Sequence, residues 1–265
     1  YLYGDTDSCF IWLPDTSDIN ELIRVGVDTQ NRLNSEYASE VAKLGIDNCN
    51  FTIEFDEIYK HMFIKARRHY VVALAYKGGH ILDKPELAYK GIEAKRSDTN
   101  VAIRNMLKRL FDILLIDGKP IDDGRELILS TWSDIMSRKI RLDEWCKPIG
   151  MTKQKGEYKN PDTQERIKAR EYSAKYFGKK YGRSGVRILY VTPNRYADFS
   201  KYPKTKYVAF EHDEDIPDDF FETHTIDADS SFDKIIRGKT EEIINIYGRD
   251  WGWMMGAGRQ VRFDD

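Results

Sequence analysis

The stretch "HMFIKARRHYVVALAYKGGHIL" (61–82) constrains the fold more than any other part of the sequence. Its residues alternate in character and include many β-branched and aromatic side chains, which is typical of strands. The pair Gly78-Gly79 fits a compact hairpin turn, so the runs on either side should pair antiparallel. The preceding "NFTIEFDEI" (50–58) has the same character and predicts another strand. We therefore expect an antiparallel sheet in the first third of the chain.

Helical periodicity precedes and follows this region. Apolar residues from Ile19 to Leu44 keep helical spacing, with Ser17 as the expected N-cap and Gly45 as a stop. Similar patterns predict helices from Asp98 to Gly118, over 122–138, from Pro161 to about Phe177 and from Lys234 onward, with a short strand at 186–193. The expected fold class is α+β: an antiparallel sheet with a long helix, followed by a mainly helical part.

Composition places the chain among soluble proteins. It has 265 residues, of which 41% are hydrophobic, and its mean hydropathy is −0.61. It contains no apolar run of the ~18 residues that a membrane helix needs, so no membrane partner is expected. Three cysteines (Cys9, Cys49 and Cys146) lack CxxC spacing. This argues against a disulfide framework and a zinc site, and favours a reducing compartment. We expect a cytoplasmic protein, or one in the host cytoplasm if the source is viral.

The net charge of −2 hides an uneven distribution. The segment 153–187 holds 11 Lys or Arg against 4 Asp or Glu, whereas 211–233 holds 10 acidic residues and no Lys or Arg. Basic clustering is what a phosphate-binding surface looks like, although a charged run is as often a solvated face. Both interpretations stay open for the basic segment.

The chain opens with "YLYGDTDSCFIWL", which predicts two short apolar strands around a polar turn. Asp5 and Asp7 would lie at the tip of this hairpin. Phosphoryl and nucleotidyl transfer use two cations about 4 Å apart, held by carboxylates that leave room for substrate phosphates. Aspartates are also common turn residues, so the Asp-Thr-Asp triplet alone does not decide between a metal site and an ordinary turn.

The whole string Tyr3-Gly4-Asp5-Thr6-Asp7-Ser8 is more specific, because it resembles motif C of the family B DNA polymerases. Three later segments resemble further motifs of that family in the correct order. "FTIEFDEIYKHMFI" (51–64) is similar to the next strand of the palm, "KARRHYVVAL" (65–74) to the primer-contact motif, and "YKGIEAKRSDT" (89–99) to the junction into the thumb. The resemblance is strong as far as about Gly118.

This resemblance implies a palm-type sheet over 1–97 and a thumb over 98–265, in a polymerase of phage or archaeal type. It also implies roles for the acidic residues. Asp7 would be the metal ligand shared between two Mg²⁺ ions, with Mn²⁺ as a substitute. Asp5 would be the adjacent carboxylate that shapes the field and the coordination. Glu54 falls where the family has a strand glutamate near the metals, although a structural role is as compatible with its position.

The resemblance further implies a set of DNA contacts. Arg67, Arg68 and Tyr70 match the primer-contact motif, with Lys65 as a further basic residue, and would hold the primer–template backbone. His69 takes the third basic place, a departure that would weaken the expected phosphate contact and make it pH-sensitive. Arg96 and Asp98 match the thumb junction, where an ion pair and a DNA contact are both compatible with the sequence.

Several parts of a family B polymerase are missing from the sequence. The motif A aspartate, the motif B lysine and the exonuclease domain all lie upstream of motif C in the family. The resemblance therefore implies the C-terminal part of a DNA-directed DNA polymerase, which adds deoxynucleotides to a primer 3′ end and needs an N-terminal chain or segment for activity. Its partners would be primer–template DNA and dNTPs. The terminal "RQVRFDD" would be either a sliding-clamp tether or a frayed tail.

Two other functions remain open on the sequence. A non-catalytic module could bind duplex DNA through Arg67, Arg68 and the basic segment 153–187, with a steep dependence on salt. An unrelated phosphotransferase could use Asp5 and Asp7 as nucleophile and acid. The second alternative needs a parallel sheet after the motif, and the sequence predicts an antiparallel one.

Overall fold

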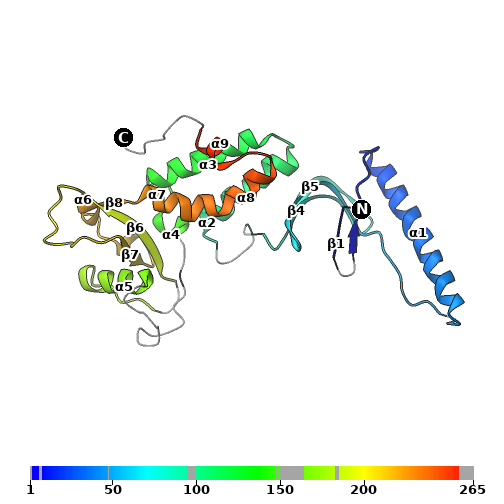
Figure 1. The fold of residues 1–265 in the computed structure, drawn as a ribbon, viewed down its shortest axis with the longest axis horizontal. Coiled ribbons are helices and arrows are strands. Elements are labelled where there is room, and N and C mark those ends of the chain that lie inside the picture. Colours follow the sequence, from blue (N-terminus) through cyan, green and yellow to red (C-terminus); the bar gives the residue numbers. More distant parts are fainter. Residues whose placement is uncertain are drawn as a thin grey trace. The chain divides into compact units, whose positions relative to one another are not determined.

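The computed structural model describes residues 2–5, 8–46, 48–92, 94, 99–146, 149, 164–182 and 185–256. The chain forms two compact units. The first unit comprises Tyr1–Gly91 with Leu115–Gly118, and the second comprises Ile92–Leu114 with Lys119–Asp265. Figure 1 labels most of their elements.

Two antiparallel sheets belong to the first unit. The opening hairpin pairs β1 (Tyr3–Asp5) with β2 (Ser8–Phe10), as predicted. The larger sheet has the order β3 (Glu57–Ala66), β4 (His69–Lys77), β5 (His80–Lys90). Gly78 and Gly79 connect β4 to β5 with φ of +54° and +88°, which confirms the predicted turn, because glycine adopts such angles without steric cost.

The long helix α1 (Ile19–Lys43) was also predicted, but its cap is Asp18 rather than Ser17. The Asp18 carboxylate accepts a hydrogen bond of 2.9 Å from the Asn20 backbone N–H. Gly45, with φ of +76°, follows the helix. None of the residues of α1 is buried.

The strand predicted at 50–58 is wrong for most of its length, because residues 50–56 have no strand structure and β3 begins at Glu57. Side chains of α1 satisfy the backbone of this segment instead. Asn34 exchanges two hydrogen bonds, of 2.8 and 2.9 Å, with the backbone of Ile53, and Gln30 accepts one of 2.6 Å from Phe55. These bonds leave the segment beside the helix rather than beside another strand.

Helices form one part of the second unit. α2 (Val101–Phe111) continues as a π-helical turn over Asp112–Ile116, the last two residues of which belong to the first unit. The others are α3 (Ile121–Met136), α4 (Leu142–Trp145), α7 (Ala228–Ser231), α8 (Gly238–Ile246), which follows a π-helical segment over Phe232–Arg237, and α9 (Trp251–Met255). Ile128, Trp132 and Ile135 of α3 are buried, as the periodicity predicted.

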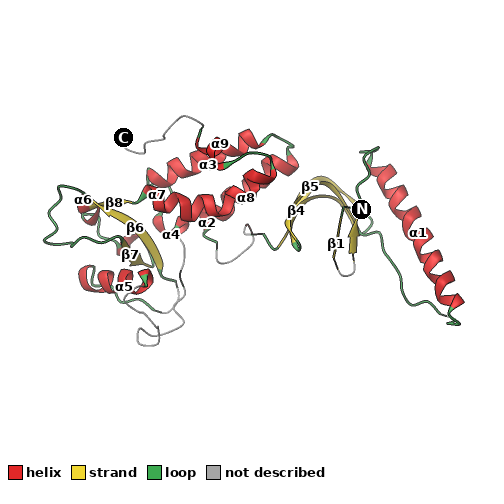
Figure 2. Cartoon of the chain, in the orientation of Figure 1, coloured by secondary structure: helices red, strands yellow, loops and turns green. Residues whose placement is uncertain are grey.

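A second three-stranded antiparallel sheet belongs to the same unit (Figure 2). Its order is β7 (Tyr207–Phe210), β6 (Arg187–Pro193), β8 (His224–Ile226), and the predicted strand is β6. The basic helix α5 (Glu165–Tyr176) packs on β7, where the Ala209 N–H donates to Ser173 Oγ at 2.9 Å. A 3-10 turn (Asp213–Asp215) and α6 (Phe220–Thr223) complete this part. The expected start of α5 at Asn160-Pro161 lies outside the described residues.

The chain is therefore an α+β protein with antiparallel sheets, as the sequence indicated. No helix within the described ranges is long and apolar enough to cross a membrane.

Candidate functional site

The β1–β2 hairpin places Asp5 opposite Ser8, at the end of the paired residues. Tyr3 pairs with Phe10, and the Leu2 N–H donates to the Phe10 carbonyl at 2.8 Å, which closes the other end. The predicted ligand Asp7 and its neighbour Thr6 lie outside the described residues. The Asp5 side chain is only 19% exposed although Asp5 ends β1, so surrounding groups must cover it.

An aromatic cluster attaches the hairpin to the larger sheet of the same unit. Tyr3 and Phe10 stack with ring centroids 5.2 Å apart. Both rings then meet Tyr70 of β4 edge-on, at 5.8 Å each, and Phe10 meets Tyr59 of β3 at 5.6 Å. Edge-to-face contacts of this kind are favourable beyond the area that they bury. Tyr70, predicted as a primer contact, therefore packs against the hairpin.

Two basic residues of the predicted primer-contact motif face Asp5. The Arg68 Nε–H donates to Asp5 Oδ2 at 2.7 Å, and Arg67 Nη2 lies 3.7 Å from Asp5 Oδ1. The Arg68 backbone N–H also donates to the Tyr3 hydroxyl at 2.9 Å. The structure thus brings together Asp5, Arg67, Arg68, Tyr3 and Tyr70, which the sequence had assigned to two separate motifs.

The acid next to this cluster is Glu57, which the sequence analysis did not select. It accepts hydrogen bonds from the Tyr59 hydroxyl and, at 2.6 Å, from Lys77. Partial burial acts to raise the pKa of Glu57, but these two partners and the Lys77 charge outweigh it and lower the pKa below its ordinary value. Burial, followed by the nearby Tyr3, Glu57 and Asp5, raises the pKa of Tyr70. Glu57 and Glu54 are three positions apart, so the palm-strand motif (51–64) contains both residues.

Glu54 belongs to the first unit too and lies in the segment that precedes β3. It is exposed, and the adjacent Phe55 stacks on Tyr76 with centroids 5.3 Å apart. Lys65 lies near the end of β3, before the Arg67-Arg68 turn, and the predicted contact Arg96 lies outside the described residues. Glu54 as a metal ligand and Lys65 as a DNA contact stay predictions.

The chemistry of the donor set suits magnesium only in part. Carboxylate oxygens are the ligands that Mg²⁺ prefers, and Asp5 supplies two of them. Within the ranges that the structure describes, no group of three or more His, Cys, Asp or Glu side chains is placed to hold a metal ion. Asp5 is moreover engaged by two guanidinium groups. A neighbouring carboxylate, such as Asp7, would have to contribute further oxygens.

The basic segment 153–187 is partly used by the fold of the second unit. The Arg170 guanidinium donates to the carbonyls of Tyr181 and Gly182, at 2.6 and 2.8 Å. Arg187 donates to two other carbonyls at 2.9 Å each, and Lys179 pairs with Asp215 at 2.9 Å. Residues 153–163 lie outside the described residues. These three cations therefore have structural partners already.

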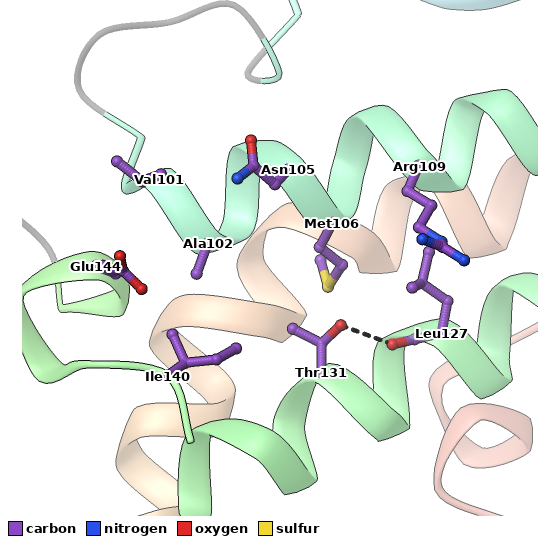
Figure 3. Close-up of a pocket in the computed structure, with 9 residues that line it drawn as sticks. All are labelled: Val101, Ala102, Asn105, Met106, Arg109, Leu127, Thr131, Ile140 and Glu144. Atoms are coloured by element: carbon purple, nitrogen blue, oxygen red, sulfur yellow. Dashed lines mark hydrogen bonds between the residues drawn. The ribbon is translucent and has the colours of Figure 1, made fainter. Parts of the chain in front are cut away.

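A groove of about 310 Å³ lies between α2, α3 and α4 in the second unit (Figure 3). Met106, Leu127 and Ile140 give it apolar walls, and Arg109 and Glu144 add charged groups at its edge. Thr131 lines it too, but its hydroxyl donates to the Leu127 carbonyl at 2.8 Å (Figure 3). The sequence analysis did not predict this groove, and nothing in its lining indicates a ligand.

Comparison with known proteins covers the part of the chain that contains all four motifs. The family model described as DNA polymerase family B matches residues 1–237. The chain belongs to DNA polymerase family B. It is 30% identical over 166 residues to a DNA polymerase of Fowlpox virus, a region that covers 60% of this chain and 16% of the viral protein.

DNA polymerases of cellular organisms are similar as well. DNA polymerase 1 of Aeropyrum pernix is 22% identical over 174 residues, which is 63% of this chain and 15% of that protein. The DNA polymerase zeta catalytic subunit of Schizosaccharomyces pombe is 26% identical over 146 residues, which is 55% of this chain and 9% of that protein. The chain thus spans only a small part of the length of these relatives.

Proposed function

We propose that this chain is the C-terminal palm and thumb part of a DNA-directed DNA polymerase, with the palm over 1–97 and the thumb over 98–265. Its opening hairpin would supply carboxylates to a two-metal nucleotidyl-transfer site. One observation carries this proposal: the hairpin with the Tyr-Gly-Asp-Thr-Asp-Ser string is docked beside the Arg67-Arg68 turn of the primer-contact motif. Two motifs that would serve one primer terminus are adjacent in the fold.

Each group would have a defined part in the reaction. When bound, magnesium would stabilise charge on the attacking 3′ oxygen and on the leaving pyrophosphate. Asp7 would be the shared ligand, and Asp5 would orient the site through its pairs with Arg67 and Arg68. Lys65, Arg67, Tyr70 and Arg96 would hold the primer–template so that the 3′ hydroxyl stays in line with the α-phosphate of the incoming nucleotide.

Some of the machinery would come from outside this chain. The motif A aspartate and the motif B lysine would be supplied by an N-terminal chain or segment, and the assembled enzyme would work in the cytoplasm of a cell or of a viral host. A phage or archaeal origin and a sliding-clamp contact by the last residues are further parts of the proposal. That terminal stretch lies outside the described residues.

Primer extension tests the proposal directly. The isolated chain should not extend a labelled primer with Mg²⁺ and dNTPs, whereas the chain mixed with a segment that supplies motifs A and B should do so. Mn²⁺ should substitute for Mg²⁺ in the mixture. Full extension by the isolated chain would refute the split site, and no extension by a mixture that forms a stable complex would refute the polymerase function.

A second function, binding duplex DNA without chemistry, is favoured by one observation. Arg67 is 75% exposed and lies on a turn, where it can reach a phosphate. Such a module would bind duplex DNA with an affinity that falls steeply as salt rises. Asp7→Ala separates the two functions, because it should abolish extension by the assembled enzyme and leave duplex binding intact.

A further inference from the structure

Arg68 makes two directed contacts with β1 that its neighbour Arg67 does not make. Its backbone N–H donates to the Tyr3 hydroxyl at 2.9 Å, and its Nε–H donates to Asp5 Oδ2 at 2.7 Å. The two acceptors lie 65 and 63 positions earlier in the sequence. One residue of the β3–β4 turn therefore forms hydrogen bonds with both ends of β1, a strand more than 60 positions earlier in the sequence.

The turn that presents Arg68 has an unusual backbone. Arg68 has φ of +62°, a region that residues with a Cβ seldom adopt. Gly91 packs against it so closely that a Cβ on Gly91 would lie 2.4 Å from the Arg68 carbonyl oxygen and 2.8 Å from the His69 ring. A residue that is held in a sparsely populated conformation needs surrounding contacts to keep it there. The bonds to Tyr3 and Asp5 are such contacts.

Arg67 differs from Arg68 in ways that suit a different role. Its guanidinium lies 3.7 Å from Asp5 Oδ1, beyond a hydrogen bond, and its side chain is 75% exposed against 57% for Arg68. A guanidinium that already donates to a carboxylate offers less to a phosphate than one that extends into solvent. The two adjacent arginines of one motif are thus not equivalent.

We propose that Arg68 is a positioning residue, which holds the β1–β2 hairpin on the β3–β4 turn and fixes the orientation of the Asp5 carboxylate. Arg67 is the member of the pair that contacts the DNA backbone. The anchoring concerns the folded chain alone, whereas its effect on catalysis rests on the polymerase function proposed above.

Hydrogen exchange on the isolated chain tests the anchor without any activity. Arg68→Gly removes the side chain, keeps the N–H, and suits the positive φ. We expect the amides of residues 2–10 to exchange about two- to fivefold faster, the range of a partly exposed ion pair. Asp5→Asn should have the same effect, and the double variant should add little. Arg67→Ala is the matched comparison and should raise the exchange rate less than Arg68→Gly, because Arg67 Nη2 lies 3.7 Å from Asp5 Oδ1, beyond a hydrogen bond. Unchanged exchange in Arg68→Gly, or fully additive effects, would overturn the proposal.

The assembled enzyme distinguishes a positioning role from a DNA contact. Arg68→Gly should lower kcat about tenfold or more, because small displacements of a catalytic group are costly, and should leave the Kd for primer–template and its salt dependence unchanged. Arg67→Ala should weaken binding and reduce the salt slope by about 1. Equal weakening of DNA binding by both variants would overturn the assignment of Arg68. If the wild-type assembly extends no primer, the polymerase function fails, while the exchange result still decides the anchor.

Discussion

The two units of this chain bury their apolar residues to very different degrees. Among the described residues of the first unit, seven hydrophobic residues are buried: Phe63, Val71, Val72, Ala73, Leu74, Tyr76 and Leu115. Eight large hydrophobic residues of that unit are exposed, with Trp12 at 69% and Leu44 at 77% among them. In the described part of the second unit, 33 hydrophobic residues are buried and three large ones are exposed.

This difference shows which unit can sustain its own fold. Burial of apolar surface is the main favourable term in folding, so the second unit has a core of its own. The first unit relies on one central strand, a narrow contact between α1 and residues 51–55, and the aromatic and ionic attachment of its hairpin. Its candidate catalytic carboxylates therefore belong to the less buried unit.

The largest expected effect is in the core of the second unit. Trp132 is 2% exposed and meets Phe232 edge-on at 5.0 Å. Trp132→Ala should lower the free energy of unfolding of that unit by about 3–5 kcal/mol, since it leaves a large cavity. Urea denaturation followed by circular dichroism measures this. Trp12→Ala is the control, because a residue 69% exposed should change the free energy by no more than about 0.5 kcal/mol. Equal losses of unfolding free energy in the two variants would contradict the difference in burial between the units.

A smaller effect is expected at the hairpin attachment. Phe10 contacts Tyr3, Tyr59 and Tyr70, but it is only half-buried. Phe10→Ala should cost about 2 kcal/mol of local stability, less than a full core deletion. The amides of β1 and β2 should then exchange faster, while those of α3 stay unchanged. Ile11→Ala, 58% exposed, serves as the control. Faster exchange throughout both units would show that they unfold together.

Acid should affect the second unit before the first. His224 is buried, with Nε2 near the Thr205 N–H at 3.3 Å, and desolvation by burial lowers the pKa of His224 below 6.5. A neutral buried histidine stabilises above its unfolded pKa, and this contribution is lost as the pH falls through the lower folded pKa. The pKa of Glu57 is lowered by folding, so the stability that this group contributes is lost only as the pH falls below about 4.5.

Between pH 6.5 and 4.5, the free energy of unfolding should therefore fall in the second unit, at no more than about 1.4 kcal/mol per pH unit. Denaturation at a series of pH values measures the slope. His224→Gln should flatten this slope. If the slope is unchanged in His224→Gln, the pH dependence arises from another titratable group.

The smallest effect is expected on the outer face of α1. Arg24 pairs with Asp28 at 3.3 Å, and both side chains are 66% exposed. Arg24→Ala should cost only about 0.3–0.5 kcal/mol, because water screens such pairs. A loss above about 1 kcal/mol in thermal unfolding would mean that this helix is more tightly coupled to the unit than its exposure indicates.

Sequence reasoning located the elements that local chemistry determines. The helix from Ile19 and the turn at Gly78-Gly79 were predicted because spacing, caps and glycine conformations are local properties. The strand at 50–56 was wrong because two side chains of α1 bond its backbone, and no local signal reveals that. β7 and β8 were missed because they are short and are stabilised by pairing with β6.

For the candidate site, the sequence indicated several of the residues but not the contacts between them. The motif order selected Asp5, Arg67, Arg68 and Tyr70 as candidate site residues, and the structure brings these four together. The sequence did not indicate that Arg68 bonds Asp5, because the two residues are 63 positions apart and an arginine in a basic motif resembles a phosphate ligand. Glu57 was overlooked because its role depends on Tyr59 and Lys77, which the fold places beside it.

The central claim is that the opening hairpin supplies carboxylates to the catalytic centre. Its most direct test is the Asp7→Ala variant in the assembled enzyme, with single-turnover extension and the Kd for primer–template measured on the same preparation. Loss of one carboxylate from a site that stabilises developing charge should slow extension about 100-fold or more and leave the Kd unchanged. Extension at the wild-type rate would contradict the assignment of the opening hairpin to the catalytic centre.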